Sequence, residues 1–298
     1  MSYYLQKYTN QHSRFLVIDN SLIHYRDEGE GQPVLLLHGA FSSLHTFEQW
    51  KNMLVKNGYR VLRLDLPGFG LTGSRMDHDY SVPTYLKVIK EFLKILQIPR
   101  CHIGGNSLGG WLAWELTLAH PEMVDRLVLV SAAGFLDDKS IPLPFKMAKT
   151  PFINKVIKYV VKRNLLEGFV KQVYGNKEKV TTELVDRYFD LFSREGNPEA
   201  FLALCNQKPK DNTHKLKKIT QETLILWGEE DEWLPVENAY RFSIQMPNSH
   251  LIIYEGVGHI AMEEIPQISG KDLLQFLDKG KKAGKGKEAP MYVMPTGS

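Results

Sequence analysis

The feature that most constrains the fold of this chain is a serine between glycines at residues 105–109, Gly-Asn-Ser-Leu-Gly. An apolar run at residues 101–103 precedes it, and a helical pattern over residues 109–120 follows it. A strand that turns this sharply into a helix strains the backbone of its apex residue. Glycines must flank the turn, because a Cβ there would collide with the neighbouring strand and helix. The motif therefore predicts a strand–turn–helix unit that presents Ser107 as a nucleophile at a helix N-terminus.

Short apolar runs and helical patterns alternate along most of the chain. The runs expected to form strands are residues 15–18, 22–25, 34–37, 60–64, 101–103, 126–130, 223–227 and 250–254. The patterns expected to form helices are residues 46–57, 82–97, 109–120, 236–245 and 266–279. The first two strands are predicted to form a hairpin. The rest alternate with helices at a spacing typical of an α/β fold with a doubly wound, mostly parallel sheet.

This alternation stops between residues 135 and 218, where helical patterns replace the strands. One pattern consists of Phe152, Ile153, Val156, Ile157, Val160 and Val161, and a second of Tyr188, Phe189, Leu191 and Phe192. We expect residues 135–218 to form a helical cap that walls off water, inserted between core parts at residues 1–134 and 219–279. Residues 280–298 are rich in lysine and glycine and are expected to be a flexible tail.

The composition is that of an ordinary globular protein, with 43% hydrophobic and 24% charged residues. The sequence contains no apolar run long enough to span a membrane and no secretory leader pattern, and Cys101 and Cys205 are its only cysteines. These features favour a cytoplasmic protein with two reduced thiols. Neither an H-E-x-x-H motif nor paired cysteines are present, so we expect no metal site.

Charge is distributed unevenly along the chain. Residues 139–218 carry an excess of nine positive charges, although the whole chain has a formal charge of only +3. One interpretation is that these lysines and arginines solvate exposed helices. The alternatives are an anionic substrate or a transient contact between the basic cap and a membrane surface. The overall balance argues against nucleic-acid binding.

Two more loops that follow expected strands carry groups that could assist a serine. Asp231 lies in an acidic run after residues 223–227, and His259 follows residues 250–254 among glycines. A histidine there is well placed as a base, and a carboxylate could orient it. Other carboxylates remain open for that second role: Glu229, Glu230, Glu232, Asp137 and Asp138.

The loop after residues 34–37 can direct backbone N–H groups into a cleft. We expect the N–H groups of Phe41 and Leu108 to form an oxyanion hole. His38, just before Gly39, is expected to hold this loop rather than to act as a base. His24 is expected to be a strand residue rather than a ligand.

In its order of nucleophile, acid and histidine, the chain resembles the α/β-hydrolase superfamily, and in particular carboxylesterases and lipases with a helical cap. The resemblance covers Phe15 to about Lys279. The motifs that carry it are residues 38–39, 65–70, 105–110, 227–231 and 258–259. The resemblance implies a triad of Ser107, His259 and Asp231, an acyl-enzyme intermediate and no cofactor.

The elbow at residues 105–110 is similar both to that of carboxylesterases and to that of carbon–carbon hydrolases of aromatic ring-cleavage pathways. The latter usually carry a Gly-Pro-Gly-like stretch after the His-Gly pair, whereas residues 40–43 here are Ala-Phe-Ser-Ser. This departure favours a carboxylic ester as the small-molecule substrate, with Trp111, Trp233 and Met262 as apolar substrate-binding residues.

The alternative is hydrolysis of a carbon–carbon bond in a vinylogous diketone acid, whose negative charge would explain the basic cap. A lyase, an acyltransferase or a ligand-binding protein on the same scaffold also stays open. So does the choice between a monomer and a dimer.

Overall fold

The structure is a computed structural model that describes residues 3–137, 141–149 and 162–282. Its centre is a sheet in the order β1-β2-β4-β3-β5-β6-β7-β8, in which β2 runs antiparallel to β1 and β4 and the other neighbours are parallel. The strands are β1 (Ser13–Ile18), β2 (Ser21–Glu28), β3 (Gln32–Leu37), β4 (Tyr59–Leu64), β5 (Cys101–Asn106), β6 (Val124–Val130), β7 (Glu222–Gly228) and β8 (Ser249–Tyr254). The apolar run that ends β3 is buried on both faces, as the sequence predicted for an inner parallel strand.

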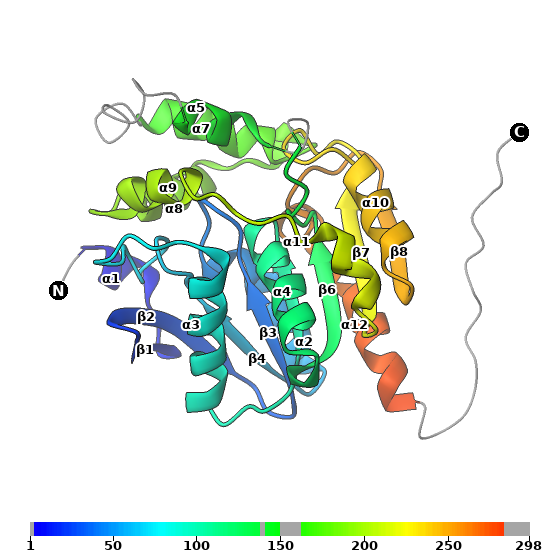
Figure 1. The fold of residues 1–298 in the computed structure, drawn as a ribbon. Helices are drawn as coiled ribbons and strands as arrows, with labels where there is room; N and C mark the ends of the chain where they lie inside the picture. Colours follow the sequence, from blue (N-terminus) through cyan, green and yellow to red (C-terminus); the bar gives the residue numbers. More distant parts are fainter. Residues whose placement is uncertain (1–2, 138–140, 150–161, 283–298) are drawn as a thin grey trace, which may run out of the picture.

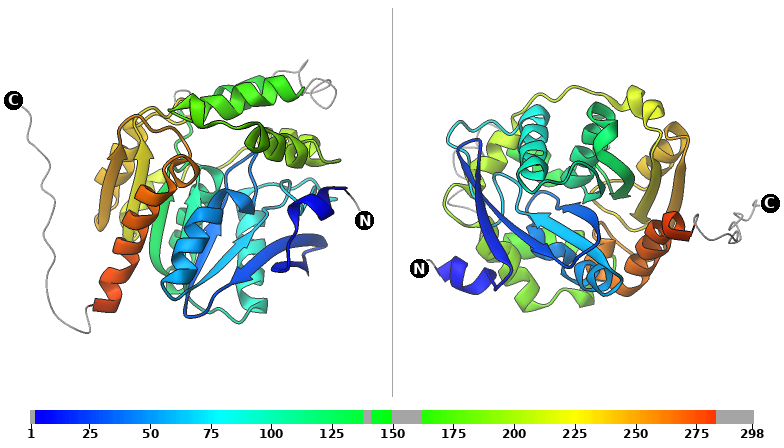
Figure 2. Two further views of the ribbon diagram at one scale, coloured as in Figure 1. Left: turned by 180° about the vertical axis from the view of Figure 1, so that it is seen from behind. Right: turned by 90° about the horizontal axis from the view of Figure 1, so that it is seen from below.

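Helices cover both faces of the sheet, which confirms the doubly wound α/β fold. The helices are α1 (Tyr3–Tyr8), α2 (Glu48–Lys56), α3 (Val82–Ile95), α4 (Leu108–Ala119), α5 (Leu143–Ala148), α7 (Arg163–Gln172), α8 (Thr182–Phe192), α9 (Asn197–Cys205), α10 (Glu237–Gln245), α11 (Ala261–Glu264) and α12 (Pro266–Lys282). Figures 1 and 2 show α3, α4 and α10 on one face and α2 and α12 on the other. None of the described helices has the length and apolarity that a membrane crossing needs.

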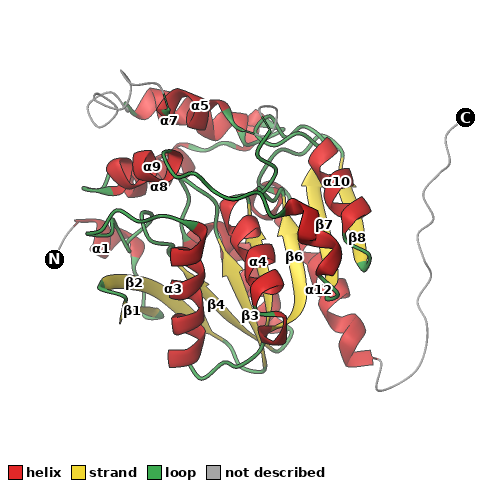
Figure 3. Cartoon of the chain, viewed as in Figure 1, coloured by secondary structure: helices red, strands yellow, loops and turns green. Residues whose placement is uncertain are grey.

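Between β6 and β7 the described residues form helices and no strand. We call α5, α7, α8 and α9 the cap; Figure 3 shows them across the edge of the sheet where the parallel strands end. The helix expected from Phe152 to Val161 lies outside the described residues. The boundaries of the cap at residues 135 and 218 stay a prediction.

Three local differences from the sequence prediction concern short or terminal helices. α1 was not expected; Lys7 and the Tyr8 hydroxyl anchor it on Asp190 of the cap, at 2.8 and 2.7 Å. The four-residue helix α11 was not expected either. α12 continues to Lys282, beyond the end predicted at residue 279; residues 283–298 lie outside the described residues, and the flexible tail stays a prediction.

A buried carboxylate, that of Asp65 at the end of β4, organises the loops beside the sheet. Its oxygens accept the N–H groups of Leu44 and Leu71, each at 2.7 Å, and His24 Nδ1 lies 2.8 Å away. Burial acts to raise the pKa of Asp65, but the attraction and hydrogen bond of His24 outweigh burial and hold that pKa well below the ordinary range. His24 is thus a buried strand residue that supports Asp65.

His38 joins the loop after β3 to the loop after β4. Its Nε2 accepts the N–H of Leu66 at 2.9 Å, and its Nδ1 lies 2.7 Å from the carbonyl oxygen of Gly39, to which it donates. Burial lowers the pKa of His38, so the ring stays neutral. The expected structural role of His38 is confirmed.

We expect acid to destabilise the fold through histidines that lose contact with water on folding, including the half-buried His45. Loss of water around the ring, with the nearby charge of Arg26, lowers the pKa of His45 from 6.5 to about 3. The unfolded chain then binds protons that the folded chain does not. The free energy of unfolding should therefore fall as the pH falls below about 6.5, by at most about 1.4 kcal/mol per pH unit for each histidine.

Thermal unfolding between about pH 7.5 and 5, followed by circular dichroism, measures this slope. In His45→Gln the free energy of unfolding should change less steeply with pH, because one histidine no longer contributes to the slope. An identical slope in the variant would contradict the assignment to His45.

Candidate active site

Ser107 occupies the turn between β5 and α4 in a conformation that side chains rarely adopt, with φ 54° and ψ −116°. The surrounding backbone holds it there. The Ser107 N–H donates to the Val130 carbonyl at 3.1 Å, and the Ser107 carbonyl accepts the N–H groups of Trp111 and Ala133, each at 3.0 Å. The strain is therefore imposed by hydrogen bonds on both sides of the serine.

The glycines of the turn allow β3, β5 and α4 to approach closely. A Cβ on Gly105 would overlap the backbone of Gly109, and a Cβ on Gly109 would overlap the backbone of Leu37 in β3. This confirms the steric reason for the spacing of the motif.

His259 and Asp231 meet beside this turn. His259 Nδ1 lies 2.8 Å from Asp231 Oδ2, and both side chains are buried. The other oxygen of Asp231 accepts the N–H groups of Trp233 and Leu234, each at 2.9 Å. These bonds fix the carboxylate and, through it, the ring of the histidine.

The second ring nitrogen of His259 is buried and has no hydrogen-bond partner among the described residues. Ser107 and His259 line the same small cavity. With Nδ1 donating to Asp231, Nε2 is left as an acceptor that could take a hydroxyl proton.

The other carboxylates considered for the role of Asp231 lie elsewhere, as far as they are described. Glu232 pairs with Lys177 at 2.9 Å and Asp137 with Arg241 at 2.7 Å, whereas Glu229 and Glu230 are exposed. Asp138 lies outside the described residues.

The two expected oxyanion donors lie next to the elbow. Leu108 is the first residue of α4, where a backbone N–H has no partner within the helix. Phe41 has φ 63°, and its loop touches the elbow at Gly39, where an added Cβ would lie 3.1 Å from Ser107 Cβ. Two N–H donors at this point could stabilise an oxyanion formed at Ser107.

The ring of Phe41 belongs to an aromatic cluster that joins the sheet to the cap. Its centre lies 4.2 Å from that of Phe201 and 5.0 Å from that of Phe192, both in the cap, and 5.8 Å from that of Trp233. The space beside Ser107 is therefore largely apolar.

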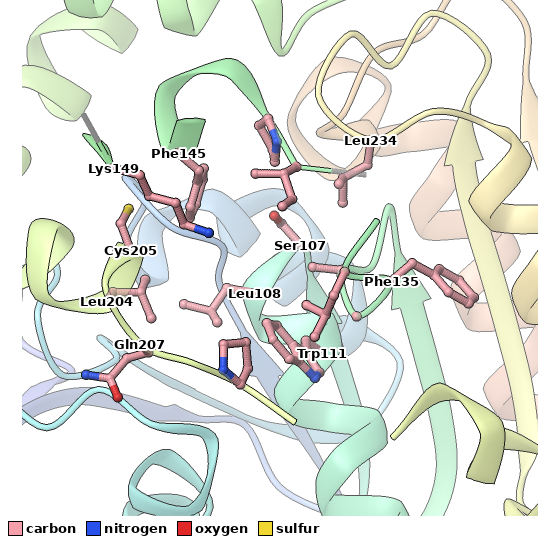
Figure 4. Close-up of a pocket in the computed structure, with 16 residues that line it drawn as sticks. Ser107, Leu108, Trp111, Phe135, Phe145, Lys149, Leu204, Cys205, Gln207 and Leu234 are labelled. Atoms are coloured by element: carbon pink, nitrogen blue, oxygen red, sulfur yellow. The ribbon is translucent and has the colours of Figure 1, made fainter. Parts of the chain in front are cut away.

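Ser107 lines two cavities of different size. The larger, drawn in Figure 4, has a volume of about 120 Å³, and its walls include Leu108, Trp111, Phe135, Phe145, Lys149, Leu204, Cys205 and Leu234. The smaller, of about 20 Å³, is lined by residues that include Phe41, Tyr188, Trp233 and His259. A carbonyl carbon held at Ser107 could extend one substituent into each cavity.

The three expected substrate-binding residues differ in position. Trp111 lines the larger cavity and also a third one of about 440 Å³ beside α3, while Trp233 lines the smaller one. The structure corrects the expectation for Met262. It is 1% exposed, packs in the core and lines none of these three cavities, because α11 turns its side chain inward.

Two residues that the sequence analysis missed shape the site. The Asn106 amide donates to the carbonyl oxygens of Val130 and His259, at 3.1 and 3.0 Å. It thereby connects the elbow to the histidine loop, residues 255–260 between β8 and α11. The position of Asn106 within the Gly-Asn-Ser-Leu-Gly motif is the feature of the sequence that could have identified it. Lys149 points into the larger cavity (Figure 4), and nothing in its local sequence marks it. Among the described residues, no cluster of histidine, cysteine, aspartate or glutamate could hold a metal ion.

Comparisons with known proteins agree with this geometry. A family model described as the alpha/beta hydrolase fold matches residues 32–266. The chain is 30% identical to a 2-hydroxy-6-oxononadienedioate/2-hydroxy-6-oxononatrienedioate hydrolase of Paraburkholderia phymatum, over 86% of this chain and 90% of that protein.

Two solved structures are also similar. A meta-cleavage product hydrolase superposes with a TM-score of 0.77 at 27% identity, over 89% of this chain and 98% of that one. A bacterial membrane phospholipase A superposes with a TM-score of 0.78 at 25% identity, over 90% of this chain and 86% of that one.

If Asp231 orients His259, Asp231→Asn should lower kcat by about 10³ to 10⁴ and leave the protein folded. The amide oxygen can still accept the N–H groups of Trp233 and Leu234, but its NH₂ faces His259 Nδ1 and favours the wrong tautomer. Steady-state kinetics and a melting curve check this. Glu230→Gln, one residue away and exposed, is the control and should retain full activity; equal losses in both variants would contradict the assignment.

Proposed function

The chain belongs to the α/β hydrolase fold family, and we propose that it hydrolyses a carbon–carbon bond beside a carbonyl group in an acidic diketone. The observation that carries this proposal is Lys149. It is the one cationic side chain among the described residues that line the two cavities at Ser107, and the rest of the larger cavity is mainly apolar. A substrate with an apolar body and a carboxylate would match this lining.

The position of Lys149 supports a role in holding a negative charge. It follows α5, and its charge acts on the Cys205 thiol across the cavity, opposing the burial that raises the pKa of that thiol to about 12. Lys149 is exposed, so a substrate carboxylate can reach its ammonium, and water partly screens their attraction. The relative from Paraburkholderia phymatum, whose name gives a dienedioate as its substrate, supports the same substrate class for this chain.

In the proposed reaction His259 Nε2 takes the proton of the Ser107 hydroxyl as Oγ bonds to the ketone carbon. The carbonyl electron pair moves onto oxygen, where the N–H groups of Phe41 and Leu108 stabilise the charge. When the carbonyl re-forms, the adjacent carbon–carbon bond breaks, and its electron pair enters the conjugated system of the departing fragment as an enolate. The imidazolium of His259 returns the proton to that fragment.

A water molecule then releases the acyl group from Ser107 by the reverse sequence. His259 takes a proton from the water, the hydroxide attacks the acyl carbon, and Ser107 leaves with a proton from His259. General-base assistance of this kind is worth about 10² to 10⁴ in rate. Asp231 holds the ring in the tautomer that leaves Nε2 free and stabilises the imidazolium.

Hydrolysis of carboxylic esters is the second candidate, and the loop at Phe41 favours it. Residues 40–43 are Ala-Phe-Ser-Ser, and the Phe41 ring packs among cap aromatics, so the neighbourhood of Ser107 suits an acyl chain. The likeness to a membrane phospholipase A points in the same direction. The same proton transfers would serve either substrate.

Turnover of the two substrate classes decides between the candidates. We expect saturable hydrolysis of 2-hydroxy-6-oxononadienedioate, followed by loss of its absorbance, with a higher kcat/KM than any p-nitrophenyl ester from acetate to palmitate. Ser107→Ala should lower either activity by at least about 10³. If only the esters are turned over, the carbon–carbon proposal is wrong and the ester hypothesis replaces it.

A charge-removing variant tests the role of Lys149. Lys149→Met keeps most of the side-chain length and should raise KM for the diketone acid roughly 10- to 100-fold, the worth of one hydrogen bond to a charged group. KM for p-nitrophenyl butyrate should stay within about twofold, because that substrate has no carboxylate. Lys146→Met, in α5 just before Lys149 and outside the lining of both cavities, is the control. An unchanged KM for the acid in Lys149→Met would exclude this contact.

A further inference from the structure

A second buried carboxylate, that of Glu264 in α11, lies behind the histidine loop. The side chain is 4% exposed and accepts three backbone N–H groups. Glu264 Oε2 accepts those of Gly258 and Gly175, at 2.8 and 3.0 Å, and Oε1 accepts that of Asn176 at 2.8 Å. Three N–H donors satisfy most of the acceptor capacity of this buried carboxylate.

These donors come from two parts of the chain that are distant in sequence. Gly258 directly precedes His259, whereas Gly175 and Asn176 belong to the link that follows α7 in the cap. The same link binds the histidine itself, because the His259 N–H donates to the Val173 carbonyl at 2.9 Å. Glu264 therefore lies where the cap and the histidine loop meet.

The cap link and the histidine loop contact each other through backbone atoms at Gly258. A Cβ added to Gly258 would lie 2.5 Å from the Val173 oxygen and 2.6 Å from the Gly175 nitrogen. Glycine is required here so that the two segments can approach within hydrogen-bonding distance. The histidine loop has the cap link on one side and, through Asn106, the elbow on the other.

The side chain of the neighbouring Glu263 also binds the cap, but none of its described hydrogen-bond partners belongs to the histidine loop. Its oxygens pair with Arg187 at 2.7 and 2.8 Å and accept the hydroxyl groups of Tyr174 and Tyr188, at 3.2 and 3.1 Å. Both side chains thus bind α11 to the cap, and of the two only that of Glu264 also accepts the N–H of Gly258, the residue before His259.

We propose that Glu264 is a positioning residue that sets the location of His259 relative to Ser107 by binding the Gly258 N–H and the cap link together. This inference rests on the proposed proton transfer between Ser107 and His259 and does not depend on which substrate is cleaved. A displaced histidine loop lengthens the path of that transfer, and a misplacement of about 1 Å can cost about 10² in rate.

Glu264→Gln tests the proposal, with Glu263→Gln as the matched control. The amide introduced at position 264 has one acceptor oxygen, and its NH₂ group would face at least one backbone N–H. We measure the second-order rate of Ser107 labelling by a fluorophosphonate, because that reaction needs the Ser107–His259 pair and no particular substrate. Melting temperatures are measured for both variants.

The expected result is a labelling rate about 10- to 100-fold lower in Glu264→Gln and within about threefold of wild type in Glu263→Gln, at comparable melting temperatures. With any substrate that is turned over, kcat should fall and KM should stay within about twofold. Equal labelling rates in the two variants, or losses that follow the melting temperature alone, would overturn the proposal.

A spectroscopic readout keeps the test independent of activity. The proton between His259 Nδ1 and Asp231 should give a strongly downfield resonance in wild type and in Glu263→Gln, and this resonance should shift or broaden in Glu264→Gln. If wild type is not labelled, the proposed Ser107 chemistry fails, and the resonance alone decides whether Glu264 positions the histidine. An unchanged resonance in Glu264→Gln would then overturn the inference.

Discussion

The close approach of β3, β5 and α4 at the elbow is the constraint on which the rest of the site depends. Gly105 and Gly109 leave no space for a side chain, and the hydrogen bonds around Ser107 hold its backbone at positive φ. Because α4 begins at Leu108, a free backbone N–H stands beside the serine. The loop after β3 lies against the same turn and brings Phe41 next to it.

Buried carboxylates satisfied by backbone N–H groups hold the loops around this elbow. Asp65 accepts two such groups beside β3 and β4, Asp231 accepts two in the loop after β7, and Glu264 accepts three where the cap meets the histidine loop. A carboxylate buried without partners would be costly, so each loop is confined to the one conformation that satisfies its anion. The conformations of the loops that form the site are therefore fixed by these hydrogen bonds, as the strands are fixed by those of the sheet.

Local patterns in the sequence predicted the sheet, most of its helices and the elbow, because strand and helix periodicities and glycine spacing act over a few residues. Asp231 was a choice among similar neighbours, and only the tertiary contact with His259 distinguishes it from Glu230 or Glu232. Lys149 and Glu264 carried no local signal, since their roles arise from the way the cap packs on the core. The prediction that Met262 binds substrate failed for a related reason. Proximity to His259 in sequence does not decide which way a short helix turns its side chains.

The unequal cavities that share Ser107 as a lining residue have a consequence for selectivity. In the proposed reaction a carbonyl carbon lies at Ser107, and we expect its larger substituent to enter the cavity of about 120 Å³ and its smaller one the cavity of about 20 Å³. The two volumes would thus orient the substrate before any bond is made. The cavity walls would accordingly select which of two possible carbonyl groups of a substrate reaches Ser107, whereas the bond that breaks there is set by the fragment that can accept its electron pair.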